Sequence, residues 1–93
     1  QGLPKIFGEP KIKVLSDFIH RINSSSLNYD DISNIYYLKS GRWNLKINND
    51  VLIKLPTNDI LRYLNLAKKI LDNENIISEN TIDLTVKNQI IVN

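Results

Sequence analysis

Few of the side chains that could perform chemistry stand together in this sequence. His20 is the only histidine, and Asp17 precedes it by three residues, so a general base oriented by a carboxylate could form on one helix face. No serine nucleophile stands in a recognised motif, and no second histidine or cysteine completes a zinc site. An exposed histidine on a polar face is the simpler interpretation, and we expect no catalytic residue and no metal site.

The remaining charged residues that could form a binding site are explained equally well as solvent-exposed surface residues. Asp30 and Asp31 could bind a cation, but adjacent side chains point apart in most backbones, and a turn is the simpler interpretation. Lys5, Lys11 and Lys13 form a small basic cluster that is typical of a solvated face. The 3 glycines are too scattered for a phosphate-binding loop. We therefore expect neither a cofactor nor a small-molecule substrate.

Length and composition indicate one small folded domain that spans residues 1–93. Hydrophobic residues make up 42% and charged residues 24%, which is ordinary for a folded domain, and the lack of cysteine excludes a disulfide framework. The net charge of +2, from 12 basic and 10 acidic residues, lacks the strongly basic balance of a nucleic-acid-binding protein. No apolar run is long enough for a membrane span. Because the chain starts at Gln1 and contains no methionine, we expect a fragment of a larger protein.

Hydrophobic spacing predicts the elements that would hold these residues. Leu3–Phe7 is predicted as an edge strand, which Gly8 and Pro10 end. Two helices follow from apolar residues at steps of three and four. These apolar residues are Ile12, Leu15, Phe18, Ile19 and Ile22 in the first helix and Ile60, Tyr63, Leu64, Ala67, Ile70 and Leu71 in the second. Thr57, just after Pro56, is the expected N-cap of the second helix.

A meander of strands is predicted between the helices, beginning with a strand over Ile32–Lys39. A two-residue turn at positions 40–41 would place Leu38 opposite Trp43. Residues 42–48 then alternate without exception between polar and apolar side chains. This alternation indicates an antiparallel sheet with one covered face and one face exposed to water.

Register decides the next turn. A two-residue loop would place Lys54 on the same face as Trp43, which is costly. A three-residue loop over residues 48–50 instead pairs Trp43 with Leu55 and gives every inward residue an apolar partner. Asp50 would then take the left-handed conformation at the end of the loop. Trp43, as the core of the sheet, and Asp50, as its turn, are therefore predicted structural residues.

The last part of the chain is predicted to complete the sheet. After a linker over residues 74–80, Thr81–Lys87 alternates, with Val86 among the inward residues and Asp83 outward as a third structural residue. A short turn then leads to a closing strand over residues 89–93. The predicted fold is α+β, with a mostly antiparallel sheet of five to six strands and two helices packed on one face.

The closing strand contains three consecutive apolar residues, Ile90, Ile91 and Val92. Neighbouring side chains of a strand face opposite sides, so at least one of the three must point away from the helix-covered face. Another element could cover it, or the strand could be an apolar edge that awaits a partner. The pattern leaves both alternatives open.

Three stretches of the sequence share a pattern with one known family. Residues 41–56 are GRWNLKINNDVLIKLP, residues 77–86 are ISENTIDLTV and residues 3–9 are LPKIFGE. The first resembles the RRWDLRLKNGVVIRLP pattern of the FtsQ/DivIB family of bacterial cell-division proteins. The second resembles the closing IDLR stretch of that family, and the third resembles the LPLIVGE lead-in of its alphaproteobacterial members. The stretches follow the family's order and span nearly the whole chain.

The resemblance implies the C-terminal β domain of a membrane-anchored protein whose cytoplasmic tail, membrane helix and POTRA domain we expect to lie outside this chain. In that family the domain is not catalytic. It lies on the periplasmic face of the inner membrane, at the division septum, and binds FtsL-like and FtsB-like proteins. An FtsB segment adds a strand beside the last strand of the sheet, which is β-augmentation. The implied partner-binding residues are Thr85, Val86, Lys87, Asn88, Gln89, Ile90, Ile91 and Val92.

Three positions depart from the family pattern. Thr85 stands where the IDLR motif has arginine and Val86 where enterobacterial members have tyrosine, so neither an ion pair nor an aromatic anchor carries over. Asp50 replaces the glycine of the turn. Strand addition uses the backbone, so the expected mode of binding survives these changes. The alternative is an interaction or structural domain of another membrane-anchored envelope assembly.

Overall fold

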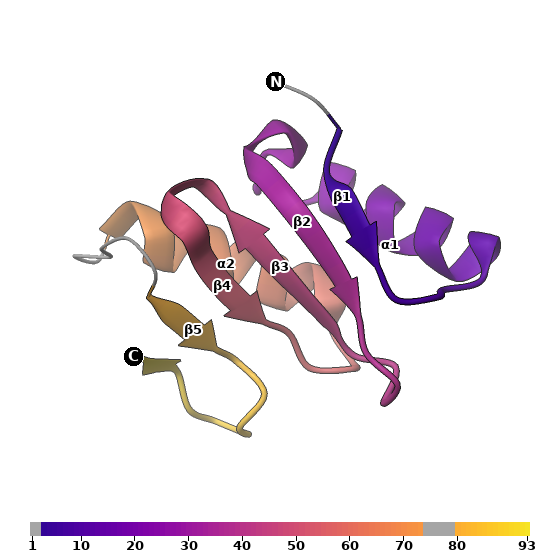
Figure 1. The fold of residues 1–93 in the computed structure, drawn as a ribbon. Helices are drawn as coiled ribbons and strands as arrows, with labels where there is room; N and C mark the ends of the chain where they lie inside the picture. The colour runs from indigo at the N-terminus through magenta and orange to yellow at the C-terminus, as the bar shows by residue number, and fades with distance from the viewer. Residues whose placement is uncertain (1–2, 74–79) are drawn as a thin grey trace.

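The computed structural model describes residues 3–73 and 80–93 and shows an α+β fold, as predicted. Two helices pack against one six-stranded sheet (Figure 1). The helices are α1 (Ile12–Ser24) and α2 (Ile60–Asn73), and the strands are β1 (Lys5–Phe7), β2 (Ile32–Tyr37), β3 (Trp43–Ile47), β4 (Val51–Lys54), β5 (Thr81–Asp83) and β6 (Ile91–Val92). The predicted linker over residues 74–80 lies outside the described residues except for its last position. No helix in the described ranges is long and apolar enough to cross a membrane.

The sheet is mixed, which corrects the expectation of a mostly antiparallel one. Its strand order is β1-β2-β3-β4-β5-β6, and the pairs β1–β2 and β4–β5 are parallel. A helix connects the two strands of each parallel pair, because a chain that re-enters the sheet in the same direction must first cross over its face. Alternation within one strand does not reveal the direction of its neighbour, so the sequence pattern did not indicate these two parallel pairs.

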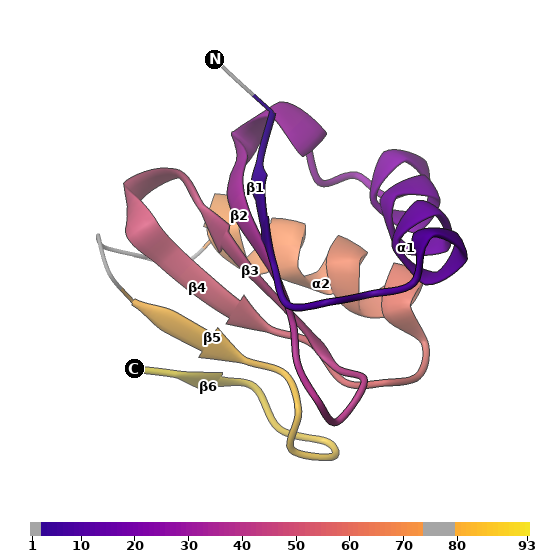
Figure 2. The same ribbon diagram turned by 45° about the vertical axis from the view of Figure 1, so that its right-hand side comes forward.

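Both helices cover the same face of the sheet (Figure 2). The crossovers β1–α1–β2 and β4–α2–β5 step in the same direction across the sheet, and they start from strands that point the same way. Right-handed crossovers of this kind place their helices on one side. The opposite side of the sheet, called the outer face below, therefore carries neither helix.

The core lies between the helices and the inner face of the sheet. Trp43 is only 5% exposed, and its ring stacks on Phe18 of α1, with 4.1 Å between the ring centroids. The Leu55 N–H donates to the Trp43 carbonyl at 3.1 Å, so the predicted position of Trp43 beneath the helices and opposite Leu55 is confirmed. Other buried residues come from the predicted apolar faces, among them Ile22, Leu45, Ile47, Val51, Ile53, Leu64, Ala67, Ile70 and Ile82. Ile12, at the start of α1, is exposed instead.

The β2–β3 hairpin has a different register from the predicted one. Tyr37, not Leu38, lies opposite Trp43. The loop is one residue longer than expected and is closed by the Gly41 N–H, which donates to the Leu38 carbonyl at 2.9 Å. Gly41 has a φ of 88°, a conformation that glycine adopts without strain. The observed register turns Ile35 inward, where it is fully buried, whereas the predicted register would have exposed it.

The β3–β4 hairpin has the predicted three-residue loop. Ile47 pairs with Val51 at its base, and residues 48–50 form a single 3-10 turn. Asp50, at the end of this loop, has a φ of 58°. The predicted left-handed conformation of Asp50 is therefore confirmed.

Replacing Asp50 by glycine should be neutral or should stabilise the protein by up to about 1 kcal/mol. Glycine removes the strain of a side chain at positive φ, and the greater freedom of the unfolded glycine chain offsets part of that gain. Denaturant unfolding of the Asp50→Gly and Asp50→Ala variants measures the effect, because alanine keeps the strained Cβ and should give no gain. A glycine variant that is clearly less stable than wild type would contradict this account.

Helix α2 begins later than the sequence suggested. Its first residue is Ile60, and Asp59 rather than Thr57 precedes it. The Asp59 carbonyl accepts the N–H of Tyr63 at 3.1 Å, and the Asp59 carboxylate forms an exposed ion pair with Arg62 at 3.8 Å. An acidic residue at this end of the helix complements the helix dipole. Thr57 as the N-cap was therefore wrong, since the chain continues for two more residues before the helix starts.

Candidate partner-binding edge

The sheet ends in two edge strands, β1 and β6. β1 carries Lys5 and follows Pro4, and natural sheets use both residue types to discourage pairing at an edge. β6 contains neither a charge nor a proline, and the preceding Ile90 is also apolar. Of the two edges, β6 is therefore the one that is better suited to accept a further strand.

The hydrogen bonds of β6 show which of its backbone groups face away from the sheet. Thr81 and Asn93 exchange two backbone bonds, each of 2.9 Å. Bonded and non-bonded pairs alternate in an antiparallel ladder, so Ile91 also points its N–H and C=O groups at β5. Val92 points its N–H and C=O groups in the opposite direction, and so does the C=O of Ile90, which shares a trans peptide with the Ile91 N–H. An added strand would find its donors and acceptors at these two positions.

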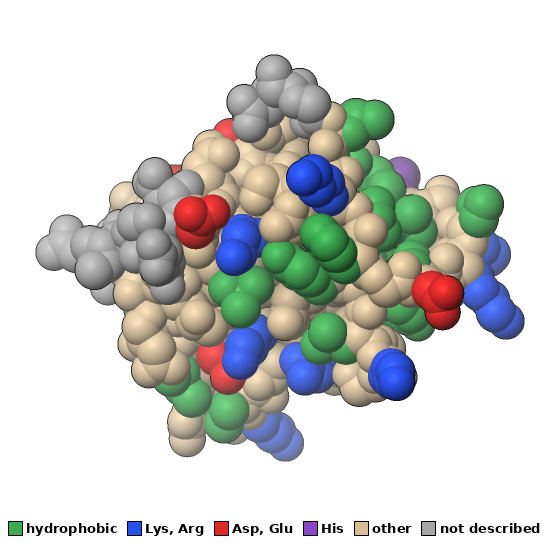
Figure 3. Space-filling view, in the orientation of Figure 1, with side chains coloured by type: hydrophobic (Ala, Val, Ile, Leu, Met, Phe, Trp, Pro, Cys, Tyr) green, Lys and Arg blue, Asp and Glu red, His purple; other side chains and the backbone are tan. Residues whose placement is uncertain are grey.

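The side chains of β6 are apolar on both faces of the sheet. Val92 pairs with the buried Ile82 on the helix-covered side and is still 43% exposed. Ile91 pairs with Asp83 on the outer face, and Ile90 is 50% exposed. Figure 3, which looks onto the outer face, shows hydrophobic side chains at its lower left, over the β5–β6 connection. The expectation that one of the three consecutive apolar residues points away from the helices is confirmed for Ile91.

The stretch before β6 is a connection rather than a strand. Alternation predicted a strand as far as Lys87, but β5 ends at Asp83, and Val86, expected inward, is 40% exposed. The predicted short turn forms here, with the Gln89 N–H donating to the Val86 carbonyl at 3.1 Å and Asn88 at a φ of 62°. The residues predicted to bind a partner therefore fall into two groups. Residues 85–89 lie in the connection, whereas Ile90, Ile91 and Val92 lie next to or within β6 at the sheet edge.

Asp83 ends β5 through its own side chain. Its Oδ1 accepts the backbone N–H of Thr85 at 2.9 Å and the Thr85 hydroxyl at 2.6 Å. A side-chain acceptor of this kind competes with the strand ladder for the backbone two residues further on. The bond from the Thr85 hydroxyl is the main cause that lowers the pKa of Asp83. The Thr85 N–H and the charges of Lys54 and Arg42 also lower this pKa, whereas partial burial raises it.

The lowered pKa of Asp83 makes part of the stability depend on pH. The folded chain favours the carboxylate, so its contribution to the free energy of unfolding is present above the ordinary pKa of 3.8 and is lost as the pH falls through the lower folded pKa. In urea melts at about pH 6 and about pH 2.5, we expect wild type to lose more stability on acidification than the Asp83→Asn variant. Equal losses would contradict the assignment.

An asparagine side chain holds the other end of β6. The Asn80 side-chain amide donates to the Asn93 carbonyl at 2.7 Å, beside the bonded pair of Thr81 and Asn93. Sequence reasoning did not identify Asn80 or Asn93, because an isolated asparagine gives no signal of a contact with a residue in the next strand. β6 is therefore anchored by polar contacts at its C-terminal end and reached through the Asp83 turn at the other end.

The isolated candidates for chemistry are not brought together by the fold. His20 is exposed, and the nearby Asp17 pairs with Lys13 at 3.6 Å. Asp31 accepts the side-chain amide of Asn48 at 3.2 Å in an exposed turn. In the part of the chain that the structure describes, no three histidine, cysteine or acidic residues lie close enough to hold a metal ion.

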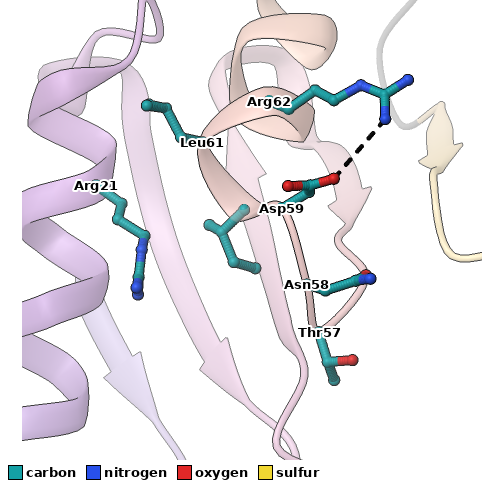
Figure 4. Close-up of a pocket in the computed structure, with 7 residues that line it drawn as sticks. Arg21, Thr57, Asn58, Asp59, Leu61 and Arg62 are labelled. Atoms are coloured by element: carbon teal, nitrogen blue, oxygen red, sulfur yellow. Dashed lines mark ion pairs between the residues drawn. The ribbon is translucent and has the colours of Figure 1, made fainter.

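A hollow of about 390 Å³ between α1 and the start of α2 also lacks the features of a ligand site. Figure 4 shows that Arg62 is paired with Asp59, at 3.8 Å, and extends away from Arg21. The two guanidinium groups therefore do not converge on a common point, as the polar groups of a binding pocket do. The β6 edge remains the candidate functional site.

A family model described as "Cell division protein FtsQ/DivIB, C-terminal" matches residues 1–85. The matched stretch covers β1 to β5 and ends at Thr85, inside the β5–β6 connection. No curated protein matches the chain.

Proposed function

The chain belongs to the FtsQ/DivIB family of cell-division proteins, and from this premise we propose that it is a protein-interaction module that binds FtsB-like and FtsL-like partners by strand addition at β6. The family is not catalytic, and its members act at the division septum together with other proteins of the division machinery. A binding role therefore agrees with the family and with the scattered polar residues described above.

The observation that carries the proposal is the open, apolar edge at β6. Val92 directs its N–H and C=O groups and Ile90 its C=O group away from β5, and the side chains of this strand are apolar on both faces. A partner strand would satisfy these backbone groups and cover apolar surface at the same time, which is how β-augmentation supplies affinity. Specificity would come from the side chains of the connection, Thr85 to Gln89, and from Ile91 on the outer face.

The family assignment also supports a proposal for the cellular setting. We propose that residues 1–93 of this chain form the periplasmic β domain of a parent protein that also has a cytoplasmic tail, a membrane helix and a POTRA domain. The lead-in LPKIFGE supports a member of the alphaproteobacterial type. In this setting the partners would be membrane proteins of the septum whose periplasmic segments reach the β6 edge.

Titration of the isotopically labelled chain with an FtsB-like periplasmic segment tests the proposal. Saturable shifts should appear in the amide resonances of Ile90, Ile91 and Val92, and the amides of β1 should not move. An FtsL-like segment added afterwards should bind the complex. Shifts confined to β1, or no binding to either segment, would contradict the proposal and favour a domain of another envelope assembly.

A further inference from the structure

Strand β6 is short, and the polar contacts that anchor it lie at its C-terminal end, around Asn93. It spans only Ile91–Val92, and all of the connection after Thr85, together with Val92 and Asn93, is exposed. A strand this short gains little from burial, so the position of its first residue, Ile91, depends on the conformation of the connection that precedes it. The position of β6 should therefore respond to whatever shapes the connection from Leu84 to Ile90.

The connection between β5 and β6 needs a hydrogen-bond acceptor from a side chain at its start. The Leu84 N–H donates to the Lys54 carbonyl at 3.0 Å, which is the last bond between the β4 and β5 segments. Backbone groups alternate between the two sides of a strand, so the Thr85 N–H lies on the side of β6, like that of Thr81, and there the pairing of β5 with β6 reaches only to Asp83 and Ile91. The Thr85 N–H is thus the first donor of the connection that has no ladder partner, and half-buried donors need one.

Asp83 supplies that acceptor. Its Oδ1 receives both the Thr85 N–H, at 2.9 Å, and the Thr85 hydroxyl, at 2.6 Å. Two bonds to one carboxylate oxygen close a side-chain bend over residues 83–85 at the end of β5, just before the turn that the Gln89 N–H closes on the Val86 carbonyl. The cations that act on this carboxylate are Lys54, which pairs with Asp83 from β4, and Arg42, which immediately precedes β3, and both favour its charged form.

We propose that Asp83 is a positioning residue for partner binding, because its bend with Thr85 sets where β6 begins and so presents the backbone groups of Ile90 and Val92 to an incoming strand. This inference rests on the proposed function of the β6 edge. Asp83 itself need not touch the partner. It acts by ordering the edge in advance, and an edge that must be ordered during binding binds more weakly.

Two variants distinguish the role of Asp83 as a hydrogen-bond acceptor from the role of its negative charge. Asp83→Ala removes both bonds, and the affinity for an FtsB-like periplasmic segment should fall about tenfold, which is about 1.4 kcal/mol. Asp83→Asn keeps an Oδ1 acceptor without the charge and should recover most of that loss. Asp17→Ala, at an exposed acidic position on α1, is the matched control and should bind as wild type does.

Amide hydrogen exchange of the chain alone provides a readout that does not depend on any partner. The amides of Ile91 and Asn93, which point at β5, should exchange about tenfold faster in Asp83→Ala than in wild type. Those of Leu45 and Ile53 in the central strands should not change. A purely structural role of Asp83 would instead accelerate exchange throughout the sheet.

The Thr85 hydroxyl completes the test. Thr85→Val removes the hydroxyl while keeping the branched shape, and it should show a smaller change in the same two amides, whereas Thr85→Ser should not. In the double variant Asp83→Ala/Thr85→Val, the effect should equal that of Asp83→Ala alone, because the two residues share one interaction.

The outcomes distinguish this inference from the proposed function. If wild type does not bind the segment but the exchange pattern is as expected, strand addition is wrong and the Asp83 bend still sets β6. If wild type binds and Asp83→Ala binds equally well with unchanged exchange at Ile91 and Asn93, the positioning role is refuted while strand addition stands.

Discussion

Truncating Trp43 to alanine should lower the free energy of unfolding by about 3–5 kcal/mol. The side chain is 5% exposed and fills the space between the sheet and α1. It stacks on Phe18, with 4.1 Å between ring centroids and 3° between ring planes, and it contacts Tyr37 at 4.6 Å. Removing the side chain loses the free energy gained by transferring a large apolar group out of water. It also leaves a cavity whose neighbouring atoms lose their contacts. The total free energy of unfolding of a small domain is about 5–15 kcal/mol. The alanine variant should therefore be close to unfolding at room temperature.

Denaturant unfolding followed by circular dichroism measures this effect. Trp43→Phe is the matched control, because it keeps a ring that can stack on Phe18 and should cost less than half as much as the alanine change. Leu61→Ala, at a partly exposed position of α2, should cost little and controls for general effects of truncation. A loss below about 1 kcal/mol for Trp43→Ala would mean that the core does not depend on this residue.

Replacing Val92 by proline should abolish partner binding while the domain stays folded. The Val92 N–H points away from β5, as deduced from the bonded pair of Thr81 and Asn93, so proline removes a donor that only an added strand would use. The preceding Ile91 is already extended in β6, which is the conformation that a following proline requires. We expect affinity for an FtsB-like segment to fall about a hundredfold, or about 2.8 kcal/mol.

Two further variants make this result specific to the outward backbone. Val92→Thr keeps the N–H and a branched side chain and should still bind. Ile91→Pro removes a donor that faces β5, so it should release β6 itself and change the exchange of the Asn93 amide. Full binding by a folded Val92→Pro variant, with a melting temperature within about 3 °C of wild type, would refute strand addition at this edge.

Much of the fold could be predicted because it depends on the local pattern of polar and apolar residues. The alternation around Trp43 placed the covered face of the sheet correctly, and the cost of an inward Lys54 selected the observed β3–β4 loop. That same register required a left-handed Asp50, which the structure confirms. In each case one face of the element is buried, so a shift by one residue would expose apolar groups and the pattern permits a single answer.

Other features could not be predicted because they depend on contacts between distant segments. The first hairpin was assigned the wrong register, since Leu38 and Tyr37 are both apolar enough to face Trp43, and only the burial of Ile35 decides between them. The length of β5 was overestimated, because the Thr85 N–H donates to the Asp83 carboxylate instead of to a neighbouring strand. Alternation in residues 81–87 is the same whether or not that bond forms.

The candidate site shows the same division. By itself, the amino-acid sequence determined that the chain closes with an apolar strand that has a side chain on each face, because the successive residues Ile91 and Val92 must point in opposite directions. Only the tertiary structure decided that this strand lies at an edge and that Ile91 rather than Val92 bonds to β5. Edge position and bonding direction are properties of the assembled sheet: they depend on two helical crossovers and on a pairing between residues 81 and 93, and no local periodicity encodes such long-range choices.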